Sequence, residues 1–305
     1  VPIGIAFGLG TGTTAVVSQA IGRGDPSVIK RLASDSLSLS FLTVLFFSAI
    51  GMLTIDPLFI LLGATPDILP LIQDYMMIWY PGMVFLVVPM VANANIRASG
   101  DTKLPALIMG CATIFNIILD PILIFGLFGA PRMELRGAAL STVIARGGAM
   151  IGALLILHFR DRLLDFKTPG LKDVWNSWKQ IVYIAIPATV TNILQPLGLA
   201  LVTKIIALQG PEVVAAWGAG SRVTAFSLIP VFALCSGLVP FVGQNWGAEK
   251  FSRVLKARKY AHRFAFAWGI LVAIVLRFAA NQVASIFSEE PDVVTEIVRY
   301  LWIIP

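Results

Sequence analysis

The sequence has few of the residues that soluble enzymes and metalloproteins rely on. Only 13% of its 305 residues are charged, and it contains two cysteines and two histidines. Cys111 and Cys235 lie inside apolar runs without paired spacing or a nearby histidine, which argues against a disulfide framework and against a metal site. His158 and His262 fall at the ends of apolar runs, and no HExxH motif is present. These absences argue against a metalloprotease.

Apolar residues dominate instead. They make up 57% of the chain, and the mean hydropathy is +0.83, far above that of a soluble globular protein. The net charge of +6 comes from Lys and Arg in short segments between apolar runs, where membrane topology explains them and nucleic-acid binding is not needed. The composition therefore predicts an all-α, multi-pass membrane protein surrounded by the lipid bilayer, which we place in the inner (plasma) membrane.

The apolar runs predict eight spans and part of a ninth. The approximate bounds are 1–20, 37–62, 72–96, 104–129, 138–159, 181–208 and 214–242, followed by a span that ends near 287 and one that begins at 295. The connections after the first, third, fifth and seventh spans hold three, two, five and six Lys or Arg residues, so they are predicted to be cytoplasmic. The same count does not decide on which side of the membrane the connection after the fourth span lies.

The run from Leu104 to Gly129 carries the most informative polar residues. Asn116 and Asp120 are four residues apart, so both side chains can point at one spot on a helix. A carboxylate near the middle of a membrane costs about 2.5–3.5 kcal/mol on insertion scales, so Asp120 is expected to face a cavity, a partner or an ion. Pro121 predicts a bend beside the acid. The alternative is a polar residue that only packs between helices.

Other polar residues inside spans are candidates for the same site or for a substrate cavity. Thr142 could donate to a carboxylate or bond back to its own helix. Arg146 is deep enough to need a partner, either Asp120 or backbone. Three further candidates for lining a substrate cavity are Tyr80, Asn192 and Gln195.

An internal repeat relates the two ends of the chain at one constant offset of 225 positions, the separation of Gly12 from Gly237. The other matching pairs are Gln19 with Gln244, Gly22 with Gly247, Pro66 with Pro291, Asp67 with Asp292 and Tyr75 with Tyr300. Six spans lie between equivalent positions, which predicts parallel repeats of a transporter.

This repeat predicts the domain organisation. We expect an amino-terminal lobe at 1–159, an inter-lobe linker at 160–180 with room for a short surface helix, and a carboxy-terminal lobe at 181–305. Two full repeats would make a twelve-span parent of roughly 450 residues. Such a parent would have one more span before this chain and about two and a half after it.

Five segments resemble the multidrug and toxic compound extrusion (MATE) transporters, at the level of the bacterial NorM-like and DinF-like members. They are VSQAIGRGD at 17–25, IRASGDTKLP at 96–105, NIILDP at 116–121, RGAALSTVIAR at 136–146 and VGQNWGAEK at 242–250. The resemblance implies two six-helix lobes, of which these spans are the second to tenth helices. It also implies an ion site at the fifth-helix pair Asn116 and Asp120 with Thr142 of the sixth helix. The family's first-helix acid has no counterpart in this chain, and Gln195 stands where some members place a glutamate.

The residues and the resemblance together predict a secondary antiporter that exports organic cations in exchange for H⁺ or Na⁺. We expect no resident cofactor, only the coupling ion, with Na⁺ at Asp120 and Asn116 as one possibility, and we expect a monomer. A lipid-linked oligosaccharide flippase of the same superfamily is the alternative, although it would want a cavity with several basic residues. An intramembrane aspartyl protease would need two deep acids, and a channel would not need two equivalent lobes.

Overall fold

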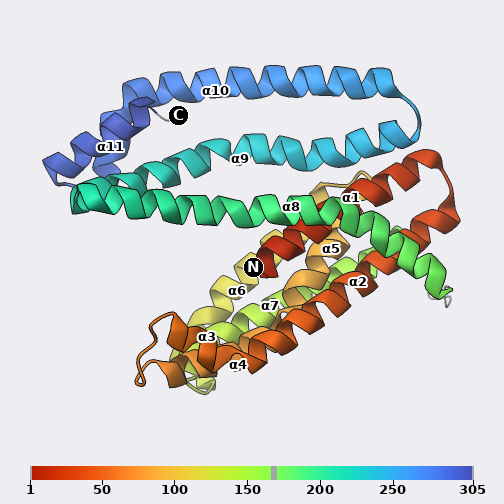
Figure 1. Ribbon diagram of the computed structural model, residues 1–305, viewed down its shortest axis with the longest axis horizontal. Helices are drawn as coiled ribbons and strands as arrows, with labels where there is room; N and C mark the ends of the chain where they lie inside the picture. Colours follow the sequence, from red (N-terminus) through yellow and green to blue (C-terminus); the bar gives the residue numbers. More distant parts are fainter. Residues whose placement is uncertain (1, 166–169, 304–305) are drawn as a thin grey trace.

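The computed structural model describes residues 2–165 and 170–303, and these form helices joined by short connections (Figure 1). Predictions that fall on residues 1, 166–169 and 304–305 lie outside the described residues. In chain order the helices are α1 (Pro2–Arg23), α2 (Pro26–Leu53), α3 (Ile55–Leu61), α4 (Leu69–Gly82), α5 (Val84–Ala98), α6 (Lys103–Phe125), η1 (Leu127–Gly129), α7 (Glu134–Leu155), η2 (Ile156–Arg160), α8 (Leu171–Ile206), η3 (Ala207–Gln209), α9 (Pro211–Gly247), α10 (Phe251–Phe287) and α11 (Pro291–Ile303).

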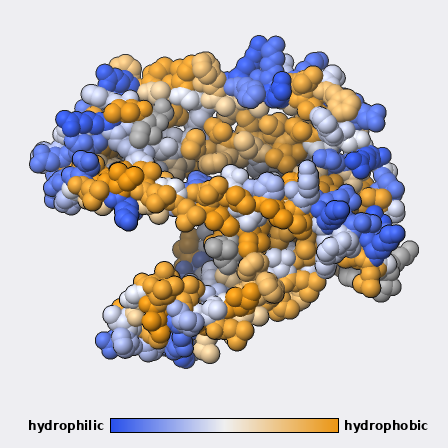
Figure 2. Space-filling view, viewed as in Figure 1, coloured by the Kyte–Doolittle hydropathy of each residue, from blue (hydrophilic) through white to orange (hydrophobic). Residues whose placement is uncertain are grey.

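Seven helices or helix pairs among the described residues are long and apolar enough to cross a membrane. They are α2, α4 with α5, α6, α7 with η2, α8 with η3, α9 and α10, and helices α1 and α11 match the first and last predicted spans. Large apolar side chains such as Phe226 and Phe278 are 70% and 80% exposed on the outer surface. Figure 2 shows apolar residues over the helix sides and polar residues gathered at their ends. This confirms the predicted all-α polytopic fold.

The helices form two groups that meet at one end and diverge at the other. Helices α2 to α7 make one group and α8 to α11 the other, with α1 between them (Figure 1). Figure 2 shows an open cleft between the groups on the side of the α3–α4 and α8–α9 connections, which we call the open end. The α1–α2 and α9–α10 connections lie at the opposite, closed end. The α6–α7 connection, which charge counting left as a tie, lies at the open end.

Close contact between α1 and α9 joins the groups at the closed end, and we call this contact the seam. A Cβ atom added to Gly22 would overlap the Gln244 carbonyl oxygen, and one added to Gly247 would overlap that of Gln19. The two contacts are reciprocal because Gly22 with Gly247 and Gln19 with Gln244 are both matching pairs of the repeat. The amide of Gln244 also donates to the Ala98 carbonyl of α5, over 2.7 Å.

Helix starts support the same offset. Helix α2 begins at Pro26 and α10 at Phe251, and these two starts are separated by the same interval as the matching pairs. The second predicted span began only at 37, but Asp25 caps the helix by accepting from the backbone N–H groups of Ser27 and Val28, and Pro26 takes the first helical position. The helix therefore extends well beyond its apolar part.

Two other connections differ from the predicted spans. The third span is divided at Met83 into α4 and α5, two residues after Pro81, whose ring nitrogen cannot donate to the preceding turn. Helix α8 begins at Leu171 and continues without a break into the sixth span, so the described part of segment 160–180 contains no separate surface helix. The lobe boundary assigned to that segment stays a prediction.

Candidate functional site

A cluster of polar side chains joins α6 to α7 in the amino-terminal group. The Asn116 amide donates to Asp120 Oδ1 over 3.2 Å and lies 3.4 Å from Ser141 Oγ and 3.5 Å from Thr142 Oγ1. The Ser141 hydroxyl donates to the same Asp120 oxygen. The structure therefore brings together Asn116, Asp120 and Thr142 as predicted, and adds Ser141.

Small residues of α7 allow this close approach. A Cβ atom on Gly137 would overlap the Leu123 carbonyl of α6, so the two backbones touch one turn before Ser141. The Thr142 hydroxyl donates to the Ala138 carbonyl over 3.0 Å, and the Ser141 oxygen, whose one proton is donated to Asp120, lies 3.0 Å from the same carbonyl.

The turn between the two helices is compact. Gly126, in the left-handed conformation with φ 75°, ends α6, and the Met133 N–H then donates to the Leu123 carbonyl over 3.0 Å. This bond returns the chain to α6 just before α7 begins. Helix α6 runs without interruption through Pro121, and the bend there stays a prediction.

Helix α4 packs against α7 beside the cluster. Its Asp74 forms an ion pair with Arg136 of α7, so α4 and α7 are fastened one turn from the cluster toward the open end. The Asp120 residue itself is partly buried.

Arg146 does not pair with Asp120. Its guanidinium lies 3.6 Å from the Met109 sulfur, beside Trp79 and Thr142. Its partner is therefore a thioether, and Arg146 lines one small pocket together with Thr142.

Tyr80, predicted to line a substrate cavity, is buried between two helices, and a role in a cavity stays a prediction. The residue is 9% exposed, and its ring fills the space above Gly51 in the core between α2 and α4, because glycine leaves room there for an aromatic ring. The residue therefore packs two helices together.

The two candidates on α8 lie apart from the cluster. The Asn192 amide donates to the Ala188 carbonyl of its own helix over 2.8 Å, and its backbone faces Gly4 of α1. Gln195 is exposed. Neither shares a contact with Asp120 among the described residues, so any role in a cavity stays a prediction.

Ser141 is the site residue that sequence reasoning missed. Its side chain is fully buried, and it belongs to a series of small residues at every fourth position of α7, all buried: Gly137, Ser141, Ala145, Ala149 and Ala153. Such a spacing marks the face that a membrane helix turns toward its neighbours. Reading that stripe would have placed Ser141 on the face of α7 that meets other helices.

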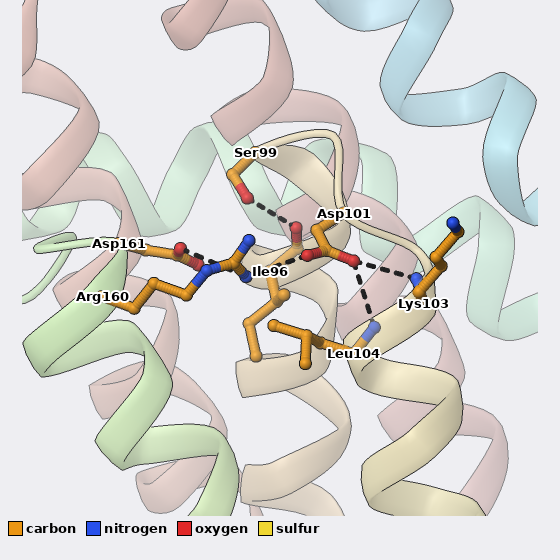
Figure 3. A network of polar contacts seen from close by, with 7 residues as sticks. All are labelled: Ile96, Ser99, Asp101, Lys103, Leu104, Arg160 and Asp161. Carbon is orange, nitrogen blue, oxygen red and sulfur yellow. Dashed lines mark hydrogen bonds and ion pairs between the residues drawn. The ribbon is translucent and has the colours of Figure 1, made fainter.

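A second polar network, at the closed end, holds the start of α6 (Figure 3). Asp101 Oδ1 accepts from the backbone N–H groups of Lys103 and Leu104 over 2.9 and 3.1 Å, and Asp101 Oδ2 lies 2.8 Å from Arg160 Nη1. The Leu104 N–H and the Arg160 guanidinium hold the pKa of Asp101 below its usual value. Burial raises the pKa of Asp161, although Arg160 lies 3.8 Å away. This network fixes the start of α6 against the end of α7.

Comparison with known proteins identifies the fold and the family. The sequence profile of the MatE family matches residues 2–122 and 187–304. This protein belongs to the MatE family. A MATE transporter from Vibrio cholerae, VcmN, has a crystal structure of a point mutant that superposes with a TM-score of 0.92 at 30% identity, covering 100% of this chain and 68% of that one. The MATE resemblance predicted from the motifs is thereby confirmed, and the protein is a membrane transporter.

Two curated relatives are named for different functions. A protein of Shewanella oneidensis named FAD transporter is 38% identical over 301 residues, which cover 99% of this chain and 67% of that protein. A probable multidrug resistance protein NorM of Thermotoga maritima is 25% identical over 285 residues, covering 93% of this chain and 61% of the relative. The chain thus spans about two thirds or less of these curated relatives.

Proposed function

We propose that this MatE-family protein exports small organic cations in exchange for protons or sodium ions that move inward, with the Asp120 cluster as the coupling site. The observation that carries the proposal is the convergence of two donors, the Asn116 amide and the Ser141 hydroxyl, on one oxygen of Asp120. The other carboxylate oxygen and the oxygen of Thr142 are then the groups that would take an ion or a proton.

The chemistry of the cluster suits a small hard cation or a proton. Sodium prefers oxygen ligands, as other hard cations do, and the cluster supplies a carboxylate and two hydroxyls, while the Asn116 amide donates to them. Softer transition metals favour imidazole and thiolate ligands, and the four residues of the cluster offer neither. An ion-binding acid inside a membrane span is in keeping with a coupling role.

The shape of the molecule supports alternating access. The cleft between the two groups is open at one end, and the seam closes the other. Because the closed-end connections carry most of the Lys and Arg, the positive-inside rule makes that end cytoplasmic and this conformation outward-facing. Ion binding at Asp120 would then favour one of two conformations by binding it more tightly. We further propose that the protein works as a monomer in the plasma membrane.

Replacing Asp120 with Asn tests the coupling role. We expect Asp120→Asn to lose ion-driven export of ethidium from proteoliposomes at least tenfold while the protein still folds and inserts. Asp56→Asn is the matched control, because Asp56 is an exposed acid toward the open end whose recorded partner is Gln73. Ion-driven export that persists in Asp120→Asn would refute the proposal.

Export of an anionic dinucleotide is the second candidate, because the 38% identical relative is named FAD transporter. An anionic cargo would need basic residues, and Arg222 in α9 is an exposed guanidinium on a span. Proteoliposomes loaded with FAD or with ethidium distinguish the two. Gradient-driven efflux of FAD alone would favour the second candidate.

A further inference from the structure

A cavity of about 750 Å³ lies between α2, α7 and the first turns of α8, near the closed end. It shares no residue with the Asp120 cluster, and we call it the lateral cavity. Its lining is mostly apolar and includes Ile151 and Leu155, whose side chains are 59% and 51% exposed on the outer surface of the helices. The lateral cavity can therefore be reached from outside the bundle.

Asp35 is the unusual member of this lining. The residue is only 4% exposed, and its Oδ2 atom is buried without a hydrogen-bond partner among the described residues. Burying a carboxylate without a partner is costly, so such a group usually has a counter-charge. The surrounding backbone is held in place, because Trp178 Nε1 donates to the Asp35 carbonyl over 3.0 Å and the Asp165 N–H donates to Ser34 Oγ over 2.8 Å.

The charges around Asp35 do not supply that counter-charge in full. Arg31, one turn earlier on α2, lies 3.7 Å from Asp173 of α8 and is shared with that acid. Asp165 and His158 also line the lateral cavity, and each takes part in an interaction of its own. Arg31 is therefore divided between Asp35 and Asp173.

The helix that carries His158 is irregular at this point. Residues Ile156–Arg160 form a π-helical turn, η2, at the end of α7. Such single wide turns occur often at functional sites because they redirect side chains away from the regular helix face. Here the turn carries both His158, in the lateral cavity, and Arg160, in the network with Asp101.

We propose that the lateral cavity binds an amphiphilic monovalent cation, with its apolar body against Leu37, Leu154 and Trp178 and its positive charge at Asp35. An apolar chamber with a buried, unpartnered carboxylate oxygen fits that ligand class, whereas a neutral acyl chain would leave the acid uncompensated. The cavity lies at the closed end, on the outer side of the bundle, where a cation dissolved in the inner leaflet could reach it. This inference rests on the proposed function only for the direction in which the bound cation would be transported.

A local protection experiment tests this binding. Ser38 lines the lateral cavity, so Ser38→Cys in a background with Cys111 and Cys235 replaced by Ser reports occupancy through its alkylation by N-ethylmaleimide. The probes are tetraphenylphosphonium and tetraphenylborate, which have nearly the same shape and opposite charge. In lipid nanodiscs we expect the phosphonium to protect the introduced thiol and the borate not to protect it.

Variants separate charge from shape. We expect Asp35→Asn to raise the phosphonium concentration needed for half-protection at least tenfold, and Leu155→Trp, which narrows the cavity by the extra volume of an indole, to weaken protection. Asp25→Asn removes the same charge from the exposed cap of α2 outside the lining and should change nothing.

Two results would overturn the proposal and make the cavity a lipid site. They are equal protection by both probes, and unchanged protection in Asp35→Asn. Asp120→Asn should keep full protection, because the lateral cavity and the Asp120 cluster have no residue in common. Failure of the coupling proposal is therefore distinguishable from failure of this one.

Discussion

Ser18 of α1 and Gly243 of α9 are in contact, and the interval between them in the chain is that of the repeat, so each occupies the same position in its own half. A Cβ atom on Gly243 would overlap the Ser18 hydroxyl. Two equivalent residues can touch only where they lie close to the axis that relates the repeats. The seam therefore lies close to this axis, and its closing or opening involves both halves alike.

A larger side chain at the seam should disfavour the conformation in which this end of the molecule is closed. Gly243→Val adds a branched side chain where no space exists, and overpacking of this kind costs about 1–3 kcal/mol. That cost corresponds to a shift of about 5- to 150-fold in the balance between conformations. We expect export to fall tenfold or more, and thiol reagents to reach a cysteine placed at Ala20 more readily. Gly218→Val on the same helix, which meets no described atom within 4 Å, should behave like the parent protein.

The hydroxyl of Ser141 should affect the coupling ion and not the fold. Removing a hydrogen bond to an ionised group costs about 1.5–3 kcal/mol, so Ser141→Ala should change the ion concentration that half-activates export about tenfold or more. The concentration should rise for Na⁺, which loses an oxygen ligand, and fall for H⁺, because the donated bond opposes protonation of the carboxylate. Thr113→Ala is the control on α6, because that exposed hydroxyl donates to its own helix at Met109. Identical ion activation in both variants would remove Ser141 from the site.

The two acids beside Arg160 should have opposite effects on stability. Asp101 has a lowered pKa, so its contribution is present above its unfolded pKa of about 3.9 and is lost as pH falls through the lower folded value. Asp101→Asn should therefore lower the melting temperature at pH 7.5, with the difference shrinking only below about pH 4. Asp161 has a raised pKa, so its ionised form at neutral pH is the unfavourable one.

For Asp161→Asn we accordingly expect an unchanged or higher melting temperature at pH 7.5, and a difference that fades as pH falls and the native carboxyl takes up its proton. Thermal unfolding in detergent at pH 7.5 and 4.5 measures both variants. A parallel loss of stability in the two at pH 7.5 would contradict the opposite pKa shifts.

The contact between Asn116 and Asp120 could be predicted from the sequence because its information is local. Asn116 and Asp120 are one helical turn apart, and a carboxylate in an apolar run is costly enough to stand out. The residues that complete the cluster come from another helix. Which hydroxyl of α7 would reach Asp120 depends on the approach of Gly137 to Leu123, a contact that no spacing within α6 reveals.

Helix bounds failed where polar sequence continues a helix. Hydropathy placed the start of the second span at 37, but the cap at Asp25 and Pro26 extends α2 into a charged segment. For the same reason the burial of Asp35 was missed. Hydropathy placed this residue in a connection between spans, whereas in the structure it is buried against α8. The packing of Tyr80 on Gly51 could not be predicted either, because Gly51 is on another helix.

The reciprocal placement of Gly22 on Gln244 and Gly247 on Gln19 bears on how fast the transporter can switch. Main-chain oxygens rest on bare α-carbons at these two contacts, so no side chain has to change rotamer there before the helices part, although the Gln244 amide must leave the Ala98 carbonyl. Such a contact tolerates only glycine at its two positions, yet it adds little to the activation barrier for separating the helices. Turnover should then be limited by ion release or cargo binding, while the separation of the halves stays quick.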